Sequence, residues 1–186
     1  MDKKRANPSN LLVKECIVQA LLQLIQKKPL STITISELCE KAGVSRMTFY
    51  RNYESKEEIF TKHLAELFAE YKNDTYDGDG EGIYYDEAHM IHYFTSLYRY
   101  KDFLDGLLRC GFGTYFLEMI HEYLIEKWGK TADHYTLAAF SGSLYHFFYL
   151  WAKEGHKQQV EVLAHKLSEI YRGRVCTNRR EFYPRP

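Results

Sequence analysis

Hydrophobic residues recur at helical spacing along most of the chain, with polar residues between them. The first stripe predicts a helix over residues 11–28, which Asn10 can cap and Pro29 ends. Residues 30–33 are expected to form a short extended link. The stripe consists of Leu12, Cys16, Ile17, Ala20, Leu21, Leu24 and Ile25.

The next apolar positions predict two short helices joined by a tight turn. Thr34 can cap the first helix, and Glu37 stands three residues later, which fits a capping box. Gly43 suits the turn because glycine adopts the left-handed conformation at little steric cost. Ser45 can cap the second helix. Residues 33–56 are therefore predicted to form a helix-turn-helix.

The remaining pattern is helical as well, and no segment shows the alternation typical of a strand. The clearest loop is 73–82 (NDTYDGDGEG), which holds three glycines and four acidic residues. We predict the further helices at about 56–72, 85–100, 103–109, 114–128, 132–153 and 158–172.

Charge is distributed unevenly, although the whole chain has a formal net charge of zero. Residues 1–56 carry ten Lys and Arg against five Asp and Glu, whereas residues 57–170 carry ten against nineteen. Residues 171–186 carry five against one. A basic N-terminal part on an acidic body suggests an anionic partner for the former.

The four cysteines lie far apart, and no CxxC spacing occurs. We find no signal peptide, and no apolar run approaches the roughly 20 residues of a membrane helix. Cys16 and Cys39 fall on apolar helix faces, as small buried residues do. We therefore expect a cytoplasmic protein with reduced thiols and no membrane partner.

The segment ITISELCEKAGVSRMTFYRNYESKEEIF resembles the N-terminal domain of TetR-family transcriptional regulators. The resemblance covers roughly 50 residues, and the turn glycine, the cap serine and the aromatic pair all fall at the family spacing. Three positions depart mildly from the family pattern: Cys39 stands where alanine is common, Met47 where glycine or proline is common, and Tyr53 where phenylalanine is common.

Together these observations predict an all-α fold. We expect an N-terminal three-helix helix-turn-helix DNA-binding domain and a C-terminal helical bundle for regulation and dimerisation. The expected boundaries are 1–55 for the DNA-binding domain, 56–72 for a connector helix, 73–172 for the ligand-binding and dimerisation domain, and 173–186 for a basic tail. The resemblance implies a homodimer that reads a palindromic double-stranded operator through successive major grooves.

The resemblance also implies which residues face DNA. By side-chain chemistry, Arg46 suits a bidentate contact to guanine, and Thr48 suits a base or a thymine methyl group. Thr34, Tyr50 and Lys56 suit phosphate. The alternative interpretation of each is a solvated helix surface. The full set is Thr34, Ser36, Ser45, Arg46, Met47, Thr48, Tyr50, Asn52 and Lys56.

Helices 132–153 and 158–172 resemble the dimer-forming pair of the family. Small residues at 138–143 permit close approach of another helix, and the apolar surface around them exceeds what one packed face needs. The alternative is ordinary packing within one chain.

The aromatic residues of 85–128 suggest a partly polar cavity for an effector, because their many tyrosine hydroxyls need partners. Core packing is the alternative for each residue. The candidate ligand-binding residues are Tyr93, Leu97, Phe116, His121 and Tyr145.

We expect no cofactor, no metal site and no enzymatic activity. His89 and His92 lie three residues apart, but the sequence holds no HExxH or CxxC motif. It also lacks a nucleophile elbow, a P-loop and a dinucleotide fingerprint. The leading hypothesis is a repressor released from its operator by a small molecule. The competing hypothesis is a regulator of the same fold without a pocket, controlled by a protein partner of the co-activator type.

Overall fold

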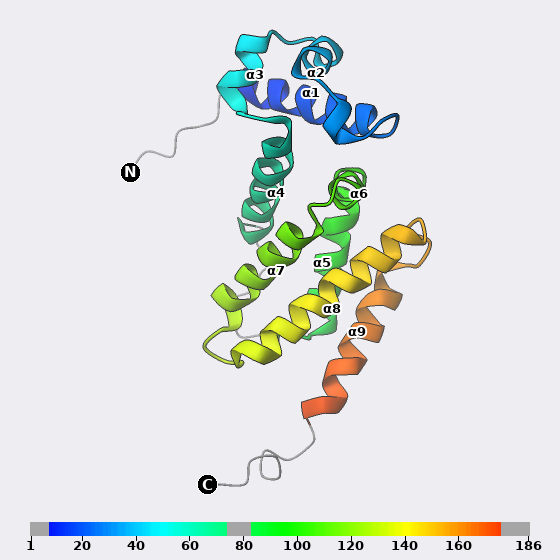
Figure 1. Cartoon of the computed structure of the whole chain (residues 1–186). Coiled ribbons are helices and arrows are strands. Elements are labelled where there is room, and N and C mark those ends of the chain that lie inside the picture. The colour runs from blue at the N-terminus through cyan, green and yellow to red at the C-terminus, as the bar shows by residue number, and fades with distance from the viewer. Residues whose placement is uncertain (1–7, 74–82, 176–186) are drawn as a thin grey trace, which may run out of the picture. The chain divides into compact units, whose positions relative to one another are not determined.

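The structure is a computed structural model that describes residues 8–73 and 83–175. Every regular element within these two ranges is a helix, which confirms the all-α prediction (Figure 1). The elements in chain order are α1 (Pro8–Ile25), the short 3-10 helix η1 (Leu30–Thr32), α2 (Ile35–Ala42), α3 (Arg46–Asn52), α4 (Lys56–Asn73), α5 (Glu87–Arg99), α6 (Lys101–Arg109), α7 (Gly113–Trp128), α8 (His134–Lys153) and α9 (Val160–Val175).

Helix boundaries differ from the sequence prediction mainly around α1. This helix begins at Pro8. Proline fits the first turn of a helix, because the backbone N–H groups there form no hydrogen bond within the helix and the N–H that proline lacks is not needed. The predicted loop 73–82 falls almost entirely outside the described residues, as does most of the predicted basic tail 173–186.

The link before α2 is a 3-10 turn rather than the predicted extended segment. The backbone N–H of Thr32 donates to the carbonyl oxygen of Pro29 at 3.0 Å, and the Thr32 hydroxyl donates to the same oxygen at 2.8 Å. A proline that fixes the backbone at the start and a threonine that closes on its carbonyl favour this tight turn.

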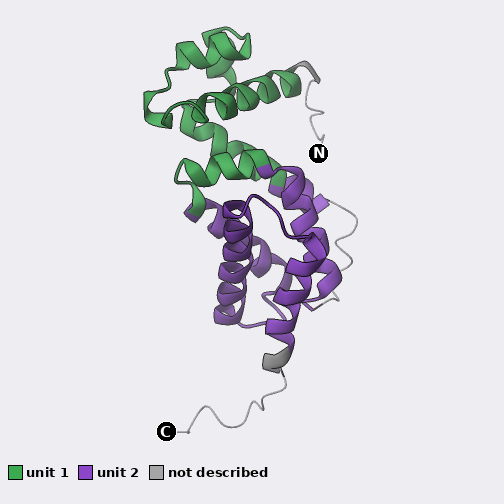
Figure 2. Cartoon of the chain, turned by 90° about the vertical axis from the view of Figure 1, so that its right-hand side faces the viewer, with its two compact units in different colours: residues 1–67, 102–113 green, residues 68–101, 114–186 purple. Residues whose placement is uncertain are grey.

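The chain divides into two compact units, shown in different colours in Figure 2. The first takes in residues 1–67 together with 102–113, and the second takes in 68–101 together with 114–186. The sequence prediction placed a boundary near residue 56 and assigned the helix around 103–109 to the body. The structure instead groups that helix, α6, with the helix-turn-helix.

Close packing in the first unit explains why α6 belongs to it. A Cβ atom added at Gly106 would lie 2.8 Å from Leu22 Cδ2 and 2.9 Å from Ile25 Cδ1. The rings of Phe103 and Phe112 contact Phe60 of α4, with centroid distances of 5.9 and 5.0 Å. Helix α6 therefore covers apolar side chains of α1 and α4.

The second unit is built around aromatic side chains from three helices. Phe94 of α5, Phe116 of α7 and Phe140 and Phe148 of α8 are all fully buried. Helix α9 packs against α5, where the Ser168 hydroxyl donates to the carbonyl oxygen of Tyr85 at 2.9 Å. In the part of the chain that the structure describes, no helix is long and apolar enough to cross a membrane.

Candidate nucleic-acid interface

The turn between α2 and α3 is built as the sequence predicts. Gly43 adopts the left-handed conformation with φ 67°, and Val44 N donates back to the Cys39 carbonyl oxygen at 3.0 Å. The Ser45 hydroxyl caps α3 by accepting from Thr48 N at 3.0 Å. These short-range hydrogen bonds satisfy backbone groups that the two helix ends would otherwise leave unpaired.

The cap of α2 is only half of the predicted capping box. Thr34 Oγ1 accepts from Glu37 N at 3.2 Å, as predicted. The Glu37 carboxylate does not return to the cap and instead pairs with Lys28 Nζ at 2.5 Å. This hydrogen bond from Lys28 holds the pKa of the Glu37 carboxyl below its usual value.

Helix α3 buries one face and exposes the other. Phe49 is fully buried and anchors the helix in the first unit. Met47 is 76% exposed and Tyr50 is 49% exposed, and Arg46 and Arg51 are exposed beside them. The exposed face therefore presents two cations, a phenol and a thioether, with no acidic side chain among them.

Asn52 lies on the buried face, which contradicts its predicted place among the DNA-facing residues. It is 9% exposed, and its Nδ2 donates to the Thr48 carbonyl oxygen at 2.9 Å. Lys62 Nζ in turn donates to the Asn52 carbonyl oxygen at 3.1 Å. Asn52 closes the end of α3 onto α4 and is not available to a groove.

Four further candidates lie near the N-terminal ends of α2 and α3. Thr34 and Ser36 are exposed at the start of α2, where backbone N–H groups favour an anion. The Ser45 and Thr48 hydroxyls lie 2.9 Å apart and hydrogen-bond each other. Thr48 is half-buried, so it stands at the edge of the exposed face rather than at its centre.

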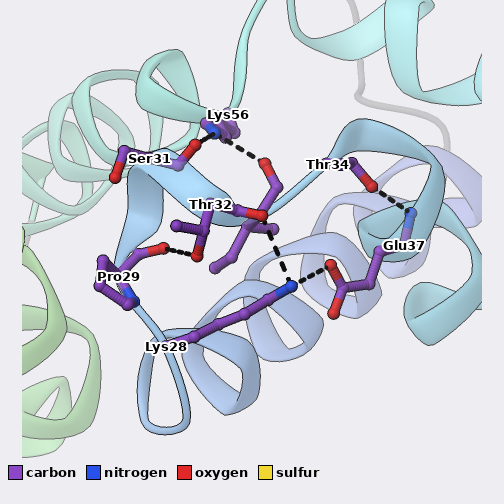
Figure 3. A network of polar contacts seen from close by, with 8 residues as sticks. Lys28, Pro29, Ser31, Thr32, Thr34, Glu37 and Lys56 are labelled. Carbon is purple, nitrogen blue, oxygen red and sulfur yellow. Dashed lines mark hydrogen bonds and ion pairs between the residues drawn. The ribbon is translucent and has the colours of Figure 1, made fainter.

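Lys56 is held differently from the sequence expectation. Its ammonium donates to the carbonyl oxygens of Ile33 at 2.7 Å and Ser31 at 3.3 Å (Figure 3).

Sequence reasoning also left Arg51 out of the candidate set. Helical spacing could have found Arg51, because it lies four residues after Met47 on the exposed side.

Comparison with known proteins bears on this domain directly. The family model described as bacterial regulatory proteins of the tetR family matches residues 17–62, which contain the helix-turn-helix. The helix-turn-helix part of the chain is therefore similar to the DNA-binding domain of that family. No curated protein matches it.

Several solved structures resemble the described fold at low sequence identity. Lin0861 from Listeria innocua has a TM-score of 0.73 at 12% identity and covers 92% of this chain and 96% of its own. The dihydroxyacetone kinase operon activator DhaS has a TM-score of 0.62 at 17% identity, with coverages of 89% and 97%. FadR from Bacillus subtilis in complex with stearoyl-CoA has a TM-score of 0.55 at 14% identity, with coverages of 84% and 96%.

The five candidate ligand-binding residues lie on α5, α7 and α8 of the second unit. Phe116 is fully buried and meets the ring of half-buried Tyr145 at a centroid distance of 5.9 Å. His121 Nδ1 lies 3.4 Å from the Ser141 hydroxyl. Tyr93 is buried and Leu97 is half-buried. The structure thus brings Phe116 and Tyr145 into contact.

The Tyr93 hydroxyl is buried with no hydrogen-bond partner among the described residues. Burial raises the pKa of this phenol well above its ordinary value, so it stays protonated. The ring of Tyr71 lies near it, with centroids 6.3 Å apart, and the ring of His92 stacks on Tyr71 at 5.1 Å. A buried phenol without a partner is an O–H group that a bound polar atom could satisfy.

His89 in the second unit packs as an aromatic ring. The ring of His89 stands edge-on to Trp128 with centroids 5.0 Å apart. Burial, and then the neighbouring His92, lower the pKa of His89 to about 4, so His89 is neutral at pH 7. Within residues 8–73 and 83–175, no group of three or more His, Cys, Asp or Glu side chains is placed to hold a metal ion.

Proposed function

We propose that the chain is a sequence-specific DNA-binding transcriptional regulator that acts as a homodimeric repressor and leaves its operator when a small molecule binds. The carrying observation is the exposed face of α3 in a tetR-family domain. Buried Phe49 anchors the helix, and Arg46, Met47 and Tyr50 face outward. A helix of this kind fits the major groove and reaches base edges with its N-terminal residues.

Side-chain chemistry assigns separate roles on this surface. Arg46 at the first position of α3 can donate two parallel hydrogen bonds to guanine O6 and N7. Thr34, Ser36 and Tyr50 can donate hydroxyl hydrogen bonds to phosphate oxygens. Ser45 and Thr48 contribute mainly by capping α3 and by holding its first turn in place.

Dimerisation is supported by the surfaces of α8 and α9. Leu150, Val162 and Ile170 are large apolar residues that stand exposed on these two helices. A Cβ atom added at Gly142 would meet nothing within 4 Å, so this face of α8 is open. The Ser143 and Tyr171 hydroxyls, 2.7 Å apart, tie α8 to α9. A second copy can cover such a surface and place two recognition helices on a palindromic operator.

Control by an effector is supported by the unpartnered phenol of Tyr93 and by one similar structure. FadR from Bacillus subtilis, whose structure holds stearoyl-CoA, has the same fold at 14% identity. An effector releases DNA only if it binds the non-DNA state more tightly, and the coupling is then reciprocal.

A partner-controlled regulator is the second candidate. Full burial of Phe94, Phe116 and Phe148 favours it, because side chains that line an open cavity retain some exposure. The similar protein DhaS is described as an operon activator. In that case, another protein rather than a small molecule would act on the second unit.

Binding-site selection with the purified full-length protein tests the proposal. We expect a palindromic sequence to be enriched, and Arg46→Ala to weaken binding to it by about 1–3 kcal/mol and relax the preference at one position per half-site. Lys41→Ala is the control, because Lys41 is an exposed cation outside α3. Enrichment of no sequence by the wild-type protein would contradict the proposed function.

A further inference from the structure

Lys56, the first residue of α4, is bound to the backbone just before α2. Its ammonium donates to the carbonyl oxygens of Ile33 at 2.7 Å and Ser31 at 3.3 Å, and its side chain is half-buried (Figure 3). Hydrogen bonds from an ammonium to carbonyl oxygens are stronger than those between neutral groups. The first turn of α4 is thereby fastened to the connection between α1 and α2.

That connection is held from its other side by Lys28. Lys28 Nζ pairs with Glu37 of α2 at 2.5 Å and lies 3.5 Å from the Thr32 carbonyl oxygen (Figure 3). Between the two lysines, Ile33 is buried and Thr34 caps α2. The position of the α2 N-terminus therefore depends on one lysine that follows α1 and one that begins α4.

We propose that Lys56 is a positioning residue for DNA binding, which fixes the α2 N-terminus and its exposed Thr34 and Ser36 hydroxyls through the carbonyls of Ser31 and Ile33. The inference rests on the proposed function and changes the role that the family resemblance implied, in which Lys56 contacts phosphate. The ammonium is directed at the protein backbone, with at least two of its three N–H groups engaged there. Lys56 therefore affects DNA binding indirectly, through the position of α2.

The salt dependence of operator binding separates positioning from phosphate contact. Each phosphate that a lysine neutralises adds about one to the slope of log affinity against log salt concentration. A positioning residue changes the affinity and leaves this slope as it is. Lys56→Met removes the ammonium and keeps a side chain of similar length, so it isolates the two effects.

The experiment measures binding of the selected operator by the full-length wild-type, Lys56→Met and Lys41→Met proteins over a series of KCl concentrations. Lys41 is the matched control, because it is exposed on α2 and the described residues show no hydrogen bond or ion pair to it. We expect Lys56→Met to lose roughly tenfold in affinity with the wild-type slope, and Lys41→Met to keep both. A slope lowered by about one in Lys56→Met, or an unchanged affinity, overturns the proposal.

Hydrogen exchange gives a second measurement that needs no DNA. The N–H groups of Thr32 and Ile33 donate to Pro29 and Leu30 carbonyl oxygens at 3.0 and 3.1 Å. We expect their exchange to be faster in Lys56→Met, unchanged in Lys41→Met and partly restored in Lys56→Arg. Wild-type exchange rates in Lys56→Met overturn the proposal even if the variant binds DNA poorly. If the wild-type protein selects no operator, the proposed function fails. If the wild-type protein binds an operator and Lys56→Met shows a reduced salt slope, the proposed function stands and only the positioning role of Lys56 fails.

Discussion

The ring of Tyr50 stands edge-on to the ring of Phe49, with centroids 5.4 Å apart and planes at 85°. Phe49 is fully buried and Tyr50 is half-exposed, so this pair links the core of the first unit to the surface of α3. Edge-to-face contacts are a favoured geometry for aromatic pairs. The Tyr50 ring on the surface of α3 therefore packs against the edge of a fully buried residue.

Removing the buried partner is expected to destabilise the protein. Phe49→Ala leaves a cavity among tightly packed side chains and should destabilise the protein by about 3–5 kcal/mol. Denaturant unfolding followed by circular dichroism measures this loss. Tyr50→Ala is the control, and it should cost far less because Tyr50 is on the surface. Equal losses in the two variants would contradict the assignment of Phe49 to the core.

Met47 is expected to read a thymine methyl group. Its thioether is the most exposed large apolar side chain of α3, and apolar contact is how proteins recognise that methyl group in the major groove. Replacing operator thymines one at a time by deoxyuridine should weaken wild-type binding at one position in each half-site. The same replacement should have no effect on Met47→Ala. Sensitivity that persists in Met47→Ala would assign the methyl contact to another residue.

The stability of the second unit is expected to fall as pH drops below neutral because of His89. An unfolded histidine titrates near 6.5, whereas burial lowers the pKa of His89 in the folded chain to about 4. Since the folded pKa is lower, the unfolded state binds the proton first. The stabilising effect is complete above pH 6.5 and is lost between pH 6.5 and 4.

His89→Phe tests this dependence, because phenylalanine keeps an aromatic ring against Trp128 and does not titrate. Urea unfolding at pH 7.5 and pH 5 should show a larger loss for the wild-type protein than for His89→Phe, by about 1–3 kcal/mol. Identical pH dependence in the two proteins would show that His89 is accessible to protons in the folded state.

A charge on the exposed apolar face of α9 is expected to separate the dimer. The wild-type protein should sediment as a dimer at micromolar concentration, and Ile170→Glu should sediment as a monomer because the carboxylate would be buried without a partner. Leu12→Glu is the control, because Leu12 is an exposed apolar residue of α1, outside α8 and α9. A monomeric wild-type protein would contradict dimerisation, and a dimeric Ile170→Glu would place the interface elsewhere.

The sequence predicted those parts of the site whose contacts are local. Thr34, Gly43 and Ser45 each act within five residues of their own position, so their roles follow from residue type and spacing. Asn52 was misplaced because it was assigned to DNA by its position in the family resemblance. Its spacing of three from Phe49 puts it on the buried side of α3, and periodicity could have shown this.

Contacts between distant residues could not be predicted in this way. Glu37 pairs with Lys28 nine positions earlier, and Lys56 bonds to carbonyls 23 and 25 positions earlier. The local sequence pattern does not indicate which lysine forms which contact, because all lysine side chains have the same charge and length. The grouping of α6 with the helix-turn-helix could not be predicted for the same reason. The apolar stripe of α6 predicts that one face is buried, but it does not indicate which helices pack against that face.

The close packing at Gly106 has a consequence for the design of protein fragments. The chain leaves the first unit after residue 67 and returns to it at residue 102, where α6 comes within contact distance of Leu22 and Ile25. A fragment that stops at residue 67 would carry the whole helix-turn-helix and yet leave these leucine and isoleucine side chains open to water. The smallest piece that keeps this packing must therefore run through residue 113, and a binding assay on a shorter one would measure a damaged domain.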